Sequence, residues 1–92
     1  MKKVDFRRIE VENIEGAVEL ADVTRELGNR MYMQGRNVDE CELGRTIYLS
    51  GKVSADKESF VEISTEQAAM VKKFVADWGY VLRKAVERAI NE

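Results

Sequence analysis

The 92-residue sequence contains no histidine, no proline and a single cysteine, and each absence narrows what the protein can do. Without histidine, the chain lacks the side chain best poised for proton transfer near neutral pH and the commonest ligand of transition metals. A single cysteine excludes an intrachain disulfide and fits a reducing compartment, so we expect a cytoplasmic protein. No apolar run approaches the roughly 20 residues that cross a bilayer, and we expect no membrane contact.

The acidic and sulfur-containing side chains form no recognisable catalytic constellation. Cys41 has no histidine to activate it, and the flanking carboxylates of Glu40 and Glu42 disfavour a thiolate, so we interpret it as a small apolar filler. Asp39, Glu40 and Glu42 gather at a predicted helix start, where negative charge complements the helix dipole, and we favour this explanation over a hard-cation site. We therefore predict no enzyme activity, no cofactor and no bound metal.

The composition indicates one ordinary globular domain covering residues 1–92. Apolar residues make up 45% of the chain and charged residues 35%, with a formal charge of −2, so neither disorder nor a dedicated phosphate-binding face is indicated. From Val4 to Ala21, apolar and charged residues alternate on both sides of a turn at 13–16, which predicts a β-hairpin. The alternation slips by one residue at Arg7-Arg8, where we expect a bulge or a twist.

Two short helices are predicted next, and together they form an αα-hairpin. The first helix ends near residue 34. It is predicted from an apolar stripe with a spacing of four residues, formed by Val23, Leu27 and Met31. The second helix starts after Asn37, whose spacing from Glu40 matches a capping box, and it ends at Gly51.

The last part of the chain predicts a short second hairpin and a long helix. Val53 and Phe60–Ile63 are the two predicted strands. Ser64 and Gln67 form a capping box that opens an amphipathic helix running to residue 91. A helix this long, about 40 Å at 1.5 Å per residue, must bend, most simply at Gly79, or pack its far end on something else. The predicted fold is thus α+β: an N-terminal β-hairpin, an αα-hairpin, a short second β-hairpin and a long C-terminal helix.

One short frame occurs twice, in ELGNRMYMQG (26–35) and in ELGRTIYLSG (42–51). In each copy a glycine precedes a tyrosine by four residues: Gly28 with Tyr32, and Gly44 with Tyr48. Because helical side chains lean toward the N-terminus, each ring should lie over the turn that bears its own glycine. We interpret these residues as helix-packing positions, with close approach at the glycines and half-buried tyrosines. A recognition groove lined by both tyrosines is the alternative.

Apolar residues cover more than half the circumference of the predicted C-terminal helix. Any that stay exposed on the protomer would form a homodimer or partner interface, where Trp, Tyr and Met are enriched. We predict that five residues form this interface: Met70, Phe74, Trp78, Tyr80 and Val81. A small non-enzymatic interaction or assembly module, bound to a second copy of itself or to another protein, is therefore the leading functional prediction.

A helix-turn-helix that binds nucleic acid through residues 22–51 is the alternative hypothesis. Its recognition helix would begin with the acidic run from Asp39 to Glu42, which DNA phosphates would repel. Three arginines of this region offset the repulsion only in part: Arg30, Arg36 and Arg45. Nucleic acid is therefore the less favoured partner.

Three stretches, VELADVTRELGNRMY (18–32), ELGRTIY (42–48) and the VEIS entry to the last helix (61–64), resemble small proteins of bacteriophages and other mobile elements. The resemblance covers the larger part of the chain through motifs of low specificity. It implies a hairpin, short helices with a Gly…Ile-Tyr element and an amphipathic tail helix. It also implies an accessory or assembly role, and it assigns no functional residue.

Overall fold

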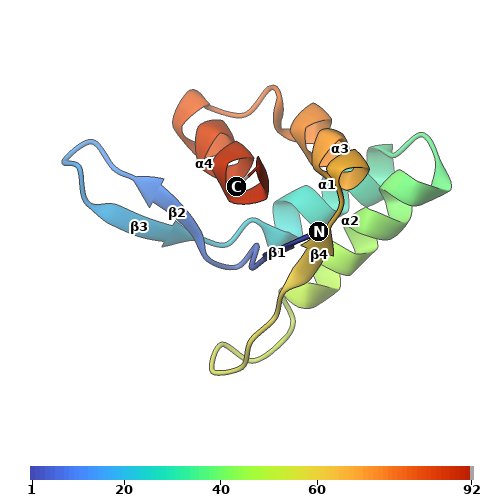
Figure 1. The fold of residues 1–92 in the computed structure, drawn as a ribbon, viewed down its shortest axis with the longest axis horizontal. Helices are drawn as coiled ribbons and strands as arrows, with labels where there is room; N and C mark the ends of the chain where they lie inside the picture. Colours follow the sequence, from blue (N-terminus) through green and yellow to red (C-terminus); the bar gives the residue numbers. More distant parts are fainter. Residues whose placement is uncertain (92) are drawn as a thin grey trace.

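Within residues 1–91, which the computed structural model describes, the chain forms four α-helices and two antiparallel two-stranded sheets (Figure 1). The predicted α+β class is confirmed. The elements follow one another in this order: β1 (Lys2–Val4), β2 (Ile9–Glu12), β3 (Val18–Ala21), α1 (Thr24–Gln34), α2 (Val38–Ser50), β4 (Val61–Ile63), α3 (Thr65–Val75) and α4 (Tyr80–Asn91). None of these helices is long and apolar enough to cross a lipid bilayer.

Strands β2 and β3 form the N-terminal hairpin, and its predicted turn is confirmed. The two strands pair in the register that sets Glu12 opposite Val18. The Asn13 side chain accepts hydrogen bonds from two backbone N–H groups of the turn, at 2.9 and 3.0 Å, and Gly16 takes a φ of 84°. The loop therefore closes through an asparagine that binds its own turn and a glycine in the left-handed region.

Strand β1 does not belong to this hairpin, which corrects the sequence prediction. The chain turns at Phe6 and Arg7, and β1 pairs antiparallel with β4, so that Val4 lies opposite Val61. Phe6 and Ile9 are both fully buried, which a straight strand would prevent because residues three apart point to opposite faces. The slip in the alternation at Arg7 is thus a turn between strands of two different sheets.

The second predicted hairpin is wrong in its pairing, because β4 forms but Val53 lies in a loop. One side chain fastens this loop to the rest of the fold. Arg7 donates hydrogen bonds to the carbonyl oxygens of Val53, Ser54 and Lys57 at 3.1, 3.0 and 2.7 Å, and its guanidinium pairs with Asp5 at 3.1 Å. The arginine thus satisfies backbone groups that a strand partner would otherwise bind.

Helices α1 and α2 approach each other most closely at two glycines. A Cβ placed on Gly28 would lie 2.8 Å from the carbonyl oxygen of Gly44 and 2.7 Å from the Cβ of Tyr48. A Cβ placed on Gly44 would lie 2.7 Å from the backbone nitrogen of Tyr32. These distances are shorter than van der Waals contacts allow, so only glycine fits at either position. The structure has the close approach that the repeated Glu-Leu-Gly frame predicts.

The predicted caps at the starts of α2 and α3 are also present. The Asn37 side chain accepts a hydrogen bond from the backbone N–H of Glu40 at 2.9 Å. Ser64 and Gln67 bind each other's backbone N–H groups reciprocally, at 3.2 and 2.9 Å, and complete a capping box. Each cap satisfies N–H groups that the first helical turn leaves without a partner.

The long predicted C-terminal helix is two helices, α3 and α4, separated by residues 76–79. After this break, α4 turns back and lies beside β2 (Figure 1). Its apolar stripe of Ala85, Val86 and Ile90 is buried there. A straight helix would carry this stripe away from the core, so the bend predicted at Gly79 is a complete break.

The core collects apolar side chains from β1, β2 and β4, from the turn before β2 and from all four helices. Its largest fully buried members are Phe6, Ile9, Leu27, Met31, Ile47, Val71, Val75 and Val86. Because these residues are far apart in the sequence, they hold both sheets and the helices together as one unit.

Candidate interaction surfaces

The five residues predicted as a partner interface do not share one exposed face. Phe74 is 7% exposed and belongs to the core, and Trp78 is only partly exposed because it packs against that core. Met70 lines a groove between α2 and α3 that does not include Trp78 or Tyr80. Tyr80 and Val81, at the start of α4, are exposed. The predicted interface is therefore reduced to the start of α4, because the break before Tyr80 turns α4 away from α3.

The two tyrosines of the repeated frame differ in burial. Tyr48 is partly buried, as predicted, and its Cβ lies against Gly28 of the other helix. The Lys52 Nζ lies 5.1 Å from the centre of the Tyr48 ring. Tyr32 is 53% exposed, so the half-buried position predicted for it is wrong. Its backbone makes the contact with Gly44 and leaves the side chain uncovered. The hollow beside Tyr48 does not include Tyr32, so the tyrosines do not line that hollow together.

Two ion-paired carboxylates connect different helices. Glu40 is buried, and it accepts hydrogen bonds from the backbone N–H of Arg36 at 2.9 Å and from the Nζ of Lys73 on α3. These two bonds, the first more than the second, lower the pKa of Glu40. Asp77 accepts two hydrogen bonds from Arg30 on α1, at 2.6 and 2.7 Å, which lowers the pKa of Asp77. Both ion pairs tie α3 and its C-terminal end to the α1–α2 pair.

Cys41 lies where α1 and α2 meet. Its Sγ is 3.4 Å from the carbonyl oxygen of Tyr32 and 3.8 Å from that of Gly35, so it fills the space at the short connection between the helices. Across residues 1–91, no three or more Cys, Asp or Glu side chains are gathered in a way that could hold a metal ion.

The geometry of α1 and α2 differs from that of a helix-turn-helix. Gly51, after the end of α2, lies against Thr24 at the start of α1, and Gly35, after the end of α1, lies against Cys41. Contacts at both ends mean that the helices run antiparallel along their whole length, whereas a helix-turn-helix pair crosses at about 90–120°. The start of α2 is also tied to α3 through Glu40.

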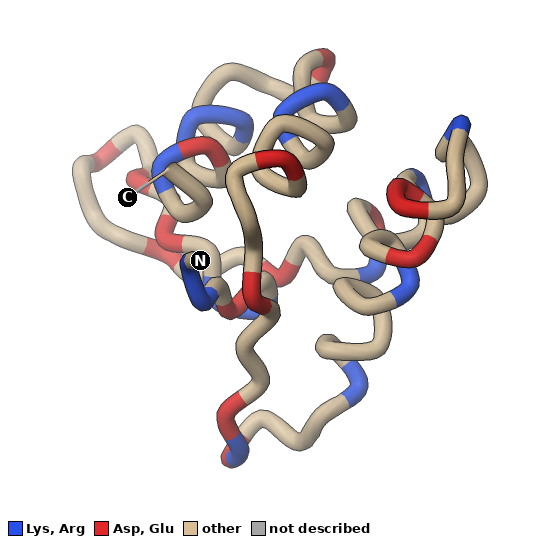
Figure 2. Tube along the Cα trace, turned by 45° about the vertical axis from the view of Figure 1, so that its right-hand side comes forward, with Lys and Arg blue, Asp and Glu red and all other residues tan. Residues whose placement is uncertain are grey.

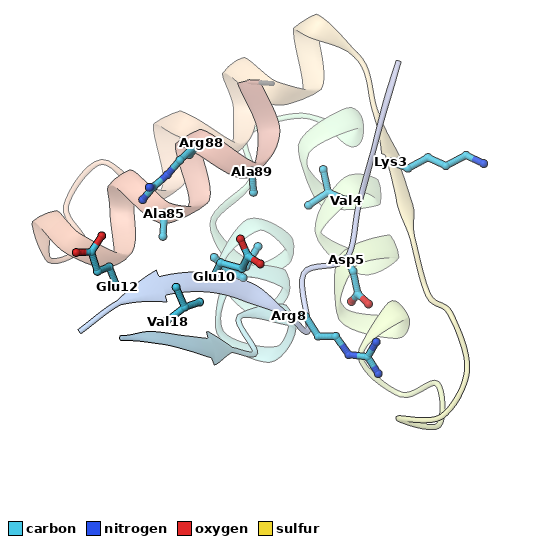
Figure 3. A pocket seen from close by; sticks show the side chains of 11 residues that line it. Lys3, Val4, Asp5, Arg8, Glu10, Glu12, Val18, Ala85, Arg88 and Ala89 are labelled. Carbon is cyan, nitrogen blue, oxygen red and sulfur yellow. The ribbon is translucent and has the colours of Figure 1, made fainter. Parts of the chain in front are cut away.

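A shallow groove of about 280 Å³ lies between α4 and the β2–β3 hairpin (Figure 3). Three residues on one side of α4 form its helical wall: Ala85, Arg88 and Ala89. Three residues on one face of the hairpin form the opposite wall: Glu10, Glu12 and Val18. Leu20 lies on the same face, because it is paired with Glu10. Val18 is 63% exposed and Leu20 is exposed to a similar degree.

Charges of both signs line this groove. Two carboxylates, Glu10 and Glu12, lie on the hairpin, and two cations, Arg88 on α4 and Lys3 on β1, also line the groove. Among the described residues, none of these four side chains is in an ion pair. Figure 2 likewise shows basic and acidic residues interspersed along the helices. An apolar centre flanked by both signs of charge can complement a second copy of itself, since a two-fold axis brings unlike charges together.

The hairpin part of this surface was missed from the sequence. Val18 and Leu20 alternate with charged residues, a pattern that predicts they face the core. In the structure the opposite face packs inward, through Ile9 and Val11. The position of the turn could have predicted this exposure. The turn sets Glu12 opposite Val18, and in this register the apolar residues of the two strands lie on opposite faces of the hairpin.

No family model matches this chain, and neither the curated proteins nor the solved structures compared with it include a match. The resemblance to proteins of bacteriophages and mobile elements stays a prediction.

Proposed function

We propose that this chain is a non-enzymatic protein-interaction module of the cytoplasm that forms a homodimer through its hairpin and α4. The contact is the hairpin–helix surface, defined by the apolar residues of β3 and α4 beside the groove that are exposed or partly exposed: Val18, Leu20, Val81 and Ala89. One observation carries the proposal. Both apolar side chains on the outer face of β3 are exposed beside the groove, and the first two residues of α4, Tyr80 and Val81, are exposed as well.

Val81 extends the helical part of this surface. It lies one turn before Ala85, on the same stripe of α4 that forms the groove wall, and it is 54% exposed. A protein of this size gains from association because a small domain buries a limited share of its apolar surface by itself. Fully burying a Val or Leu side chain contributes about 1.5–3 kcal/mol, and a two-fold axis uses each contact twice.

The balance of charge favours a second copy as the occupant. Two carboxylates, Glu10 and Glu12, lie across the groove from Arg88. In a two-fold dimer, the hairpin of one protomer can lie against α4 of the other, which sets these carboxylates beside the partner's arginine. The surface therefore pairs with itself without placing like charges together.

Light scattering on the wild-type chain and on Val81→Glu tests this proposal. We expect a dimer mass for the wild type at high micromolar concentration and a monomer mass for Val81→Glu, because a carboxylate would have to be buried at the contact. A glutamate in the first turn of α4 complements the helix dipole, so the helical circular dichroism should be retained.

Val38→Glu is the matched control. Val38 is also an exposed valine in the first turn of a helix, but it lies on α2, outside the hairpin–helix surface. We expect this variant to remain dimeric. A wild-type chain that is monomeric at high micromolar concentration, or a control that dissociates like Val81→Glu, would overturn the proposed dimer.

A further inference from the structure

A second groove, of about 600 Å³, lies between α2 and the segment that runs from β4 into α3. Its floor is apolar, formed by Leu43 and Val61, which are buried, and by Met70, which is partly buried. Phe60 also lines it and is 51% exposed. The volume is within the range of sites that hold a bulky side chain or a small ligand.

The charged side chains along the rim of this groove, called here the acidic groove, are all of one sign, although Met1 with its terminal ammonium also lines it. Four exposed carboxylates line it, two from α2, one from β4 and one from α3: Asp39, Glu42, Glu62 and Glu66. In the part of the chain that the structure describes, no Lys or Arg lines the groove, and none of the four carboxylates is in an ion pair. Lys3 is the partner of Glu62 in the β1–β4 pair without forming an ion pair with it.

Helix capping explains only half of this acidic rim. Asp39 and Glu66 lie in the first turns of α2 and α3, where carboxylates complement the helix dipole. Glu42 lies further along α2, and Glu62 lies in a strand, so neither benefits in this way. Tertiary structure brings these two carboxylates to the same groove as Phe60, which points to a ligand that is both cationic and apolar.

We propose that the acidic groove binds a Lys- or Arg-rich segment of another protein, which inserts one bulky apolar side chain between α2 and α3. The apolar side chain covers Leu43 and Met70, and the cations lie along the carboxylate rim. Such an apolar anchor within complementary charge is a common way to hold a peptide segment. This inference rests on the chain being an interaction module, but it does not depend on the dimer.

The charge of the groove separates this partner from two other occupants. Nucleic acid phosphates would be repelled by the four carboxylates. A second copy placed symmetrically on the same groove would set carboxylates against carboxylates, which disfavours a two-fold contact. A basic segment is the occupant that the rim attracts.

Fluorescence anisotropy with a labelled synthetic peptide tests the proposal. The probe is an amphipathic peptide of lysine and leucine, and two companion peptides carry glutamate in place of every lysine or serine in place of every leucine. We expect binding of the lysine–leucine peptide, weaker at high salt, and at least tenfold weaker binding of both companions, since one lacks the cations and the other lacks the anchor.

Paired substitutions locate the binding to the groove. Glu42→Gln combined with Glu62→Gln removes two rim charges without touching a helix cap, and we expect about fivefold weaker binding. Phe60→Ser should weaken binding to a similar or larger degree. The matched control, Glu15→Gln with Asp56→Asn, removes the same net charge from exposed turns elsewhere and should leave the affinity unchanged.

Each remaining outcome counts against the groove. Equal binding of the serine-containing peptide would show that the apolar floor is not used. Equal weakening by the control pair would show that only net charge matters, and no binding of any peptide would remove the proposal. A change in light-scattering mass for the rim pair would assign the groove to self-association instead. Val81→Glu should still bind the peptide, so failure of the dimer and failure of the groove are distinguishable.

Discussion

The two helix pairs of this protein, α1–α2 and α3–α4, have similarly short connections but use glycine in opposite ways. Three residues join α1 to α2, and four join α3 to α4. In the first pair, Gly28 and Gly44 bring two backbones into direct contact. In the second pair, Gly79 lies in the connection, and a Cβ added to it would meet nothing within 4 Å.

This difference separates a part of the molecule that packs on itself from a part that faces outward. The α1–α2 pair buries its glycine faces against each other. The α3–α4 pair is held at its middle by Lys73 and Asp77, which bind Glu40 and Arg30 of the first pair. After the break, α4 lies along the hairpin and leaves a groove beside it. The proposed dimer contact is on this second, more open part.

The largest effect should come from filling the glycine contact. In Gly28→Ala, the new Cβ would press on backbone atoms of α2, which cannot move as the end of a side chain can. We expect destabilisation of about 3 kcal/mol or more, a lowering of Tm by roughly 15 °C, measured by thermal unfolding with circular dichroism. Gly44→Ala should behave in the same way, because its Cβ would press on the backbone of α1.

If these two variants were as stable as the wild type, the proposed difference between the two helix pairs would be wrong. That result would mean that the backbones of α1 and α2 leave room for a Cβ between them, contrary to the 2.7–2.8 Å distances at both glycines. A double variant should lose less than the sum of the single changes, since the two glycines share one contact.

The link between the two helix pairs should weaken in acid. The lowered pKa of Glu40 means that its ionised form is favoured by folding, so its contribution is complete above the ordinary value of 4.5 and is lost as the pH falls through the lower folded-state value. Glu40→Gln removes this contribution. We expect the variant to have a lower Tm than the wild type at pH 7 and a smaller difference from it at pH 3.

Glu42→Gln is the control for this measurement. Glu42 lies on the same helix but is exposed and takes part in no ion pair of the described residues. Its substitution should change the Tm little at either pH. A constant Tm difference for Glu40→Gln between pH 7 and pH 3 would contradict the proposed role of its charge.

The smallest effect is expected at the connection of the second pair. Gly79 has room for a Cβ and does not adopt a positive φ, so Gly79→Ala should change the free energy of unfolding by less than about 1 kcal/mol. The same thermal unfolding experiment measures this. A loss as large as that of Gly28→Ala would show that the second connection is packed as tightly as the first.

Several elements could be predicted because their signals are local. The turn at Asn13 and Gly16, the caps at Asn37 and Ser64, and the spacing of the α1 stripe each depend on residues within a few positions of one another. The burial of Phe74 and the exposure of Tyr32 could not be predicted in this way. Both residues belong to helices with apolar positions on more than one side, and which side is covered depends on distant elements.

The sequence by itself determined the α+β class, the helix pair and the need for glycine at 28 and 44, since periodicity and residue size act over short distances. Only the tertiary structure decided that β4 pairs with β1, that the last helix breaks before Tyr80, and that Val18 and Leu20 face outward. These outcomes depend on which distant segments bury one another. The hydrophobic effect is non-directional, so the sequence pattern alone does not specify which segments pack together.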